Sequence, residues 1–163
     1  MSTFEWIEKL AKDELKMEES GEFDLYGSMD QTRVLESHTH DFLHQLKSLA
    51  QDMANRFNGY RGDRHSIKVF QISGTPSDFI IFRNHLKLVF ANTSPGKIKV
   101  SFLTVRGGLY EEDLKEGQPK DSDIIFATLG PFNDAVWHYK DHIVTPTSLV
   151  RYYITEFIKN SLS

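Results

Sequence analysis

A change in the spacing of apolar residues near residue 65 constrains the fold of this chain more than any other feature of its sequence. Over residues 30–58 apolar residues recur every three to four positions, the spacing of one helix face. From residue 66 they recur every second position, the spacing of one strand face, and a helical spacing returns over residues 145–158. Helices and strands segregated in this way predict an α+β fold and argue against alternating strand-helix units around a parallel sheet.

Two helices are expected before the sheet and one after it. A short amphipathic helix is expected over residues 1–17, and residues 22–28 are expected to form a connector. The long helix, over about residues 30–58, has one continuous apolar stripe, and Gly59 stands in the position typical of a helix C-terminus. The C-terminal helix is expected to begin at Thr145 with a proline in its first turn. These helices are expected to pack mainly on one face of the sheet.

The alternating region predicts an antiparallel meander of about five to six strands. The expected strands cover residues 66–72, 78–83, 86–91, 97–105, 123–129 and 134–140. A two-residue turn at Asn84 and His85 and a five-residue loop over residues 92–96 would place one set of apolar residues on the core face. That set is Phe79, Ile81, Leu86, Leu88, Phe90, Ile98, Val100 and Phe102. The polar, acidic residues 106–122 are expected to form a long loop.

Length and composition limit the possible classes of protein. A chain of 163 residues fits one domain, so a single α+β domain over residues 1–163 is expected. The chain contains no cysteine, which excludes zinc fingers, iron–sulfur clusters and thiol nucleophiles. No secretory signal and no apolar stretch long enough to span a bilayer is found, so we expect a cytoplasmic protein without a membrane span.

Charge is distributed unevenly along the chain. Residues 1–30 contain nine acidic residues and three lysines, whereas residues 56–106 contain nine basic residues and two acidic ones. The sheet face opposite the core would therefore combine lysines with an aromatic ring, which is chemistry suited to a polyanion. The candidate residues on this basic face are Lys68, Phe82, Lys87, Lys97 and Lys99. The alternatives are lysines that only cover an exposed sheet face, or an acidic N-terminal helix that packs there and neutralises the charge.

Histidines are the main candidates for a metal site. His40 and His44 are one helical turn apart, and His138 and His142 repeat that spacing. However, His40 and His44 lie on the side of the helix opposite its apolar stripe, and no Glu follows the first histidine as in the zinc-protease motif. We therefore expect surface histidines, with no metal ligand and no cofactor.

No phosphate-binding or catalytic motif that the sequence resembles has both the residues and the context that it needs. Residues 91–98 resemble a phosphate-binding loop, but Ile98 stands where a Ser or Thr must bind magnesium. No catalytic residue is therefore predicted, and an enzyme is the less favoured class.

Three functions remain open. The first is a non-enzymatic protein-binding or adaptor module, whose partner is another protein or a second copy of the chain. The second is a small-ligand or enzymatic pocket under the sheet, with Trp137, His138, Tyr139 and Tyr152 as its lining. The third is binding of nucleic acid or another polyanion through the basic face.

Overall fold

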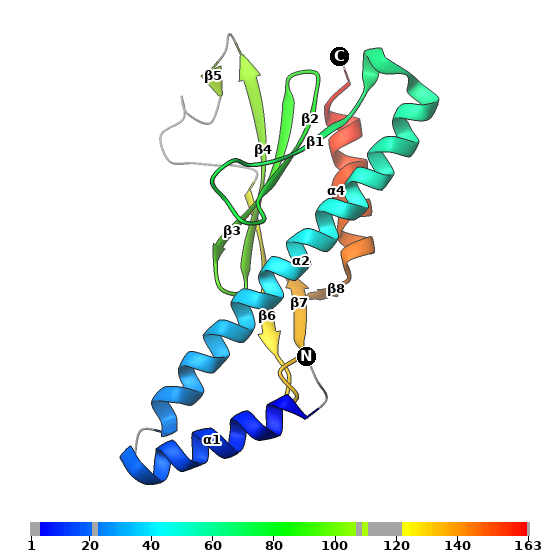
Figure 1. Cartoon of the computed structure of the whole chain (residues 1–163). Helices are drawn as coiled ribbons and strands as arrows, with labels where there is room; N and C mark the ends of the chain where they lie inside the picture. The colour runs from blue at the N-terminus through cyan, green and yellow to red at the C-terminus, as the bar shows by residue number, and fades with distance from the viewer. Residues whose placement is uncertain (1–3, 21–22, 107–108, 111–121, 163) are drawn as a thin grey trace. The chain divides into compact units, whose positions relative to one another are not determined.

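The computed structural model describes residues 4–20, 23–106, 109–110 and 122–162 of the chain (Figure 1). It divides into two compact units, Met1–Val34 and Leu35–Ser163, and each is described by itself. Most of the loop expected over residues 106–122 lies outside the described residues. Among the described helices, none combines the length and the apolar composition that crossing a membrane requires.

The first unit contains helix α1 (Glu5–Ser20) and the beginning of helix α2 (Phe23–Arg61). The connector expected over residues 22–28 is wrong, because the chain is helical from Phe23 onward. This segment contains no proline, and its one interior glycine costs a helix only about 1 kcal/mol, so propagation of the long helix can extend through it.

The long helix also ends later than expected. Gly59 keeps a helical conformation, and α2 continues to Arg61. Gly62 then adopts a left-handed conformation with φ of 79°, and its N–H donates to the Asn58 carbonyl at 2.8 Å. Gly62 therefore takes the terminating role that the sequence analysis assigned to Gly59.

The second unit is built on an antiparallel sheet, whose described strands are ordered β1-β2-β3-β4-β6-β7-β8, with β5 paired to β4. The strands are β1 (Lys68–Gln71), β2 (Phe79–Arg83), β3 (Leu86–Ser94), β4 (Lys97–Arg106), β5 (Leu109–Tyr110), β6 (Ser122–Leu129), β7 (Ala135–Tyr139) and β8 (His142–Val144). A 3₁₀ turn, η1 (Asp63–His65), precedes β1, and helix α4 (Pro146–Asn160) follows β8. The predicted α+β meander is confirmed, with β5 and β8 as short strands beyond those expected.

The predicted register between β2 and β3 is confirmed. Asn84 and His85 form the two-residue turn, so Arg83 pairs with Leu86 and Phe79 pairs with Phe90. Asn84 has φ of 58°, the positive value that such a turn requires and that asparagine tolerates.

The loop expected over residues 92–96 is wrong. Strand β3 continues to Ser94, and only Pro95 and Gly96 turn the chain into β4. A β-bulge between Asn92 and Ser94 absorbs the extra residue, and the Asn92 N–H donates to Asp78 Oδ1 at 2.9 Å. Phe90 therefore pairs with Val100 instead of the expected Ile98. Because the slip is two residues, every side chain keeps the face that was predicted for it.

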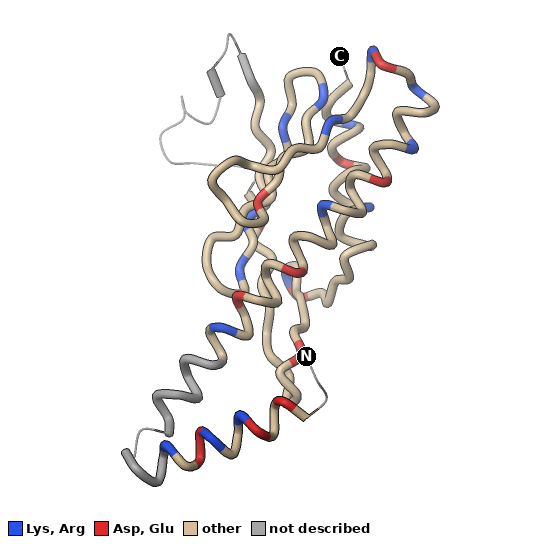
Figure 2. The backbone as a smooth tube through the Cα atoms, viewed as in Figure 1, with Lys and Arg blue, Asp and Glu red and all other residues tan. Residues whose placement is uncertain are grey.

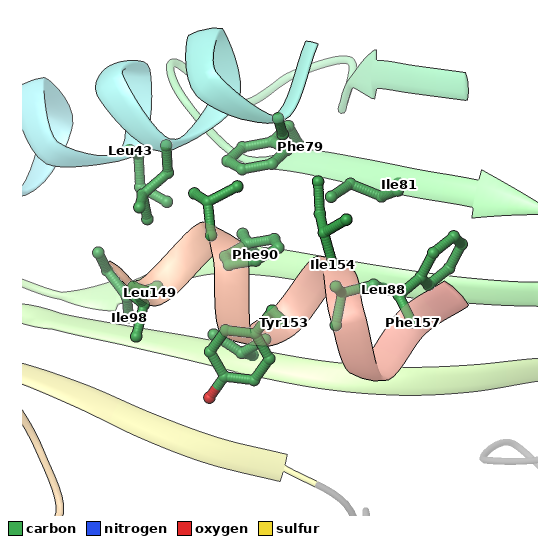
Figure 3. Packing of buried hydrophobic residues seen from close by; sticks show 14 of the residues in the cluster. Leu43, Phe79, Ile81, Leu88, Phe90, Ile98, Leu149, Tyr153, Ile154 and Phe157 are labelled. Carbon is green, nitrogen blue, oxygen red and sulfur yellow. The ribbon is translucent and has the colours of Figure 1, made fainter. Parts of the chain in front are cut away.

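The hydrophobic core lies between one face of the sheet and helices α2 and α4 (Figures 1 and 3). Phe90 stands at its centre: its ring stacks on Phe79 with centroids 4.6 Å apart and meets Tyr153 edge-on at 5.7 Å. Phe42 of α2 stacks on Trp137 of β7 at 4.3 Å. The helices thus cover the predicted core face, with Phe102 half-buried at its border.

Helix α4 begins where the sequence predicted, because Thr145 and Ser148 cap each other. The Ser148 N–H donates to Thr145 Oγ1 at 3.2 Å, and the Thr145 N–H donates to Ser148 Oγ at 3.1 Å. These bonds satisfy N–H groups that a helix start otherwise leaves without partners.

The turn between β3 and β4 is fastened to α2 at a position that only glycine suits. The buried Gly96 N–H donates to Thr39 Oγ1 at 2.8 Å, and Thr39 Oγ1 donates to the Leu35 carbonyl at 2.6 Å. Gly96 has φ of 78°, and an added Cβ would lie 3.1 Å from Leu35 Cδ2. The close approach of this turn to α2 therefore depends on the absence of a side chain.

The contrast between two glycines tests this account. Gly96→Ala is expected to lower the free energy of unfolding by about 1–2 kcal/mol, because alanine meets both a positive φ and a close contact. Gly59→Ala is the matched control: a Cβ there meets nothing within 4 Å. This variant is expected to raise stability by about 0.5–1 kcal/mol. Urea unfolding followed by circular dichroism measures both, and equal effects of the two substitutions would refute the assignment.

Candidate functional site

The sheet face opposite the helices is the first candidate site, and we call it the open face. Residues that alternate with the core residues point to it, and the buried residues of α2 and α4 all belong to the core on the other side. The side chains of the open face are Lys68, Phe70, Ile80, Phe82, Lys87, Val89, Ala91, Lys97, Lys99, Ser101, Leu103, Ser122, Ile124, Phe126, Thr128, Val136, His138 and Ile143. It is therefore a broad surface that combines apolar and basic groups.

The structure places all five residues of the predicted basic face together here. Phe82 links two of the lysines, since it pairs with Lys68 of β1 on one side and with Lys87 of β3 on the other. The Lys87 ammonium lies over the Phe82 ring, 6.0 Å from its centroid. Lys97 and Lys99 point to the same face from β4.

This face also exposes large apolar side chains, of which Ile124 and Ile143 were not among the predicted site residues. Phe70 is 51% exposed and Ile143 is 71% exposed, and Ile124 is also exposed. Ile124 reaches the open face because it pairs with Lys99, and Ile143 because it pairs with His138. Sequence alternation alone does not show how β6 and β8 pair with the rest of the sheet. The sequence therefore gave no indication that Ile124 and Ile143 lie on the open face.

A pocket on the helix side of the sheet is the second candidate site. Its volume is about 500 Å³. It is lined by Leu86, Phe102, Thr104, Asp123, Tyr139, Tyr152, Tyr153, Glu156 and Asn160, from β3, β4, β6, β7 and α4. We call it the tyrosine pocket, because three tyrosines contribute to its wall.

The three tyrosines pack against one another beside a carboxylate. The ring centroids of Tyr152 and Tyr153 lie 5.1 Å apart, and Tyr139 lies 6.0 Å from Tyr152 and 6.2 Å from Tyr153. Tyr153 is 1% exposed, and its hydroxyl donates to Asp123 Oδ2 at 2.8 Å. Burial, followed by this hydrogen bond to Asp123, raises the pKa of Tyr153 far above its ordinary value.

The other two tyrosines are perturbed in the same direction. Burial and the charge of Asp123 raise the pKa of Tyr139. Burial and the neighbouring Tyr139 raise the pKa of Tyr152. All three hydroxyls therefore stay protonated and neutral at ordinary pH, while Asp123 and Glu156 give the pocket its acidic character.

Two of the four residues predicted to line a pocket do so. Tyr139 and Tyr152 line the tyrosine pocket. Trp137 instead is buried in the core against Phe42, and His138 points to the open face. His138 stacks on Phe126 with centroids 5.0 Å apart, and its Nε2 lies 3.0 Å from Thr128 Oγ1.

The histidine pairs do not assemble one site. His40 and His44 contact each other on α2 with ring centroids 4.4 Å apart. His138 belongs to the open face, whereas His142 pairs with Tyr139 and so lies on the other side of the sheet. Within the described part of the chain, no three His, Asp or Glu side chains stand close enough together to hold a metal ion.

Removing one hydroxyl tests the link between the pocket and the core. Tyr153→Phe is expected to lower the free energy of unfolding at pH 7 by about 1–2 kcal/mol, because Asp123 loses a donor. The folded-state pKa of Tyr153 is raised, so stability is lost as pH rises above about 10, where the unfolded chain releases protons that the folded chain keeps. Above pH 10 the free energy of unfolding of Tyr153→Phe should therefore fall less steeply with pH than that of the wild type. The difference in slope should be up to about 1.4 kcal/mol per pH unit.

Urea unfolding at pH 7 to 11 measures both effects. Tyr60→Phe is the control, because it removes a hydroxyl that is 94% exposed and should leave stability at pH 7 unchanged. An unchanged slope in Tyr153→Phe would contradict the assignment.

The two candidate sites have opposite chemistry. The open face presents lysines and apolar side chains, which suits an acidic and partly apolar partner. The tyrosine pocket presents carboxylates, hydroxyls and aromatic rings, which suits a cation. No family model matches the chain, no curated protein matches its sequence, and no solved structure matches it.

Proposed function

We propose that the protein is a non-enzymatic protein-binding module, and that its open face takes helix α1 of a second copy of the chain. The observation that supports this most directly is the open face itself. It holds exposed large apolar side chains among lysines on the side of the sheet that α2 and α4 leave uncovered. Apolar groups supply the free energy of such a contact, and charges select the partner.

The charges of the open face have one sign. Four lysines point to it, and none of its described strand side chains is an Asp or Glu. A face of this kind is stabilised by an acidic partner and repels a basic one.

Helix α1 has the complementary chemistry. Its sixteen residues hold six acids and three lysines, and Figure 2 shows red and blue positions alternating along it. Trp6, Ile7, Leu10 and Leu15 are all exposed. A short helix is marginal in water without an apolar contact, so α1 gains stability from a surface that covers these side chains.

The dimensions of the two elements agree. A helix of sixteen residues is about 24 Å long, which is the width of about five neighbouring strands. The sheet has seven strands in its main order, so α1 fits across the open face. If each copy gives its α1 to the other, two identical contacts form and the assembly closes as a dimer.

Sedimentation velocity of the full chain tests the proposal. The wild type is expected to be a dimer at micromolar concentration, with a dissociation constant that increases with salt. Ile7→Asp with Leu10→Asp on the helix, and Lys97→Glu with Lys99→Glu on the sheet, should each raise the dissociation constant by at least about tenfold. Arg56→Glu with Arg151→Glu is the matched control, because it reverses two exposed charges on helices outside the open face.

Mixing the two weakened variants separates this arrangement from other dimers. The sheet variant keeps an intact α1, and the helix variant keeps an intact open face, so the mixture should restore one of the two contacts. A mixed dimer that forms where neither variant dimerises alone supports the proposal. A monomeric wild type, a dimer insensitive to both variants, or nucleic acid bound to the purified protein in place of a second copy would overturn it.

A further inference from the structure

The tyrosine pocket plays no part in the proposed dimer contact. It opens on the helix side of the sheet, between α4 and the strands that carry Asp123 and Tyr139. Its volume of about 500 Å³ lies within the range of sites that hold small molecules.

The wall of the pocket is aromatic where a ligand can reach it. Tyr152 is 47% exposed and Tyr139 is half-buried, and both belong to the lining. Tyr153 is buried, so its main contribution is the hydroxyl that holds Asp123 in place. The faces of tyrosine rings carry partial negative charge and attract cations.

The charged groups of the pocket also have one sign. Asp123 and Glu156 line it, and no Lys, Arg or His is among the described lining residues. Asp123 Oδ2 accepts the Tyr153 hydroxyl, and the Tyr139 hydroxyl also bonds to this carboxylate. A carboxylate has about four acceptor sites, so Asp123 can still accept from a ligand. Thr104 and Asn160 add further oxygen acceptors.

We propose that the tyrosine pocket binds a small organic cation of the primary ammonium class. Tyr139 and Tyr152 provide aromatic surface for the cation and its alkyl chain, and Asp123 and Glu156 accept its N–H groups. A primary ammonium has three N–H donors for these acceptors, whereas a quaternary ammonium has none. A quaternary ligand would displace water from the carboxylates and donate no hydrogen bond to their remaining acceptor sites, so this pocket selects the primary class.

A titration followed by NMR tests the site on the full chain. The probes are n-butylammonium chloride and tetramethylammonium chloride at equal ionic strength. The n-butylammonium shifts in a ¹H–¹⁵N spectrum are expected to concentrate at Asp123, Tyr139, Tyr152 and Glu156. Binding of n-butylammonium should be at least about fivefold tighter than that of tetramethylammonium.

Substitutions at exposed or half-buried positions identify the contributing groups without disturbing the core. Glu156→Gln and Tyr152→Ala should each weaken n-butylammonium binding by about fivefold or more. Tyr152→Phe keeps the ring and should retain most of the affinity. Glu36→Gln removes one negative charge from an exposed position on α2 and is the control, with wild-type affinity expected.

The outcomes decide the proposal. Localised shifts that weaken in Glu156→Gln and Tyr152→Ala, but not in Glu36→Gln, support it. Shifts spread over other surfaces, equal or tighter binding of tetramethylammonium, or unchanged binding in Glu156→Gln would overturn it.

Discussion

Tyr153 joins the hydrophobic core to the acidic pocket, and both candidate sites depend on the packing that holds it. Its ring meets Phe90 edge-on, Phe90 stacks on Phe79, and the Tyr153 hydroxyl donates to Asp123. Neighbouring residues of α4 and α2 bury their apolar side chains against the same face of the sheet. The packing of α2 and α4 on this face, with Tyr153 within it, thus leaves the opposite face open and places the pocket beside Tyr153.

The one-sided cover explains why the open face has its composition. An antiparallel sheet commonly keeps one face in water, and lysines there protect the protein against sheet-to-sheet association. That explanation accounts for Lys68, Lys97 and Lys99. It does not account for Phe70 and Ile143, because large exposed apolar side chains promote association. The combination of lysines with such side chains is what the proposed acidic, partly apolar partner requires.

Alternation in the sequence was sufficient to predict the two faces of the central strands. Residues 79–90 contain a turn that fixes their register, and even the unforeseen bulge at Asn92 left the faces unchanged, because the slip was two residues. The two-residue slip also explains why Lys97 and Lys99 were assigned to the correct face, although the loop before them was predicted incorrectly.

The tyrosine pocket could be predicted only in part. Tyr139 and Tyr152 were predicted to line a pocket under the sheet together with Trp137, but Trp137 and Tyr139 lie two positions apart and share a face. Phe42 of α2 covers Trp137, whereas Tyr139 lines the pocket beside α4. The spacing of residues in the sequence cannot show this difference. Asp123 was assigned no role in a pocket, since its contact with Tyr153 joins residues thirty positions apart. Such contacts depend on tertiary packing, which local patterns do not encode.

The tyrosine pocket and the proposed contact at the open face differ in how much of their structure is fixed before binding. Helix α4 is fixed at its start by the Thr145 and Ser148 cap, and at its end by Arg83, whose Nη1 donates to Ser161 Oγ at 3.2 Å. Burial, together with the charge of Arg61, lowers the pKa of Arg83.

Two interactions favour the positive charge of Arg83. Its guanidinium lies 5.1 Å from the Phe57 ring centroid, and it stands beside the C-terminal end of α4, where the helix dipole favours a cation. Tyr152 and Glu156 therefore stand on a helix held at both ends, and a cation in the pocket costs little ordering of the chain. In the proposed dimer, helix α1, whose apolar side chains are exposed, would lose conformational freedom on docking. The proposed contact at the open face would consequently need a large apolar area, whereas the proposed pocket ligand would need only a few well-placed groups.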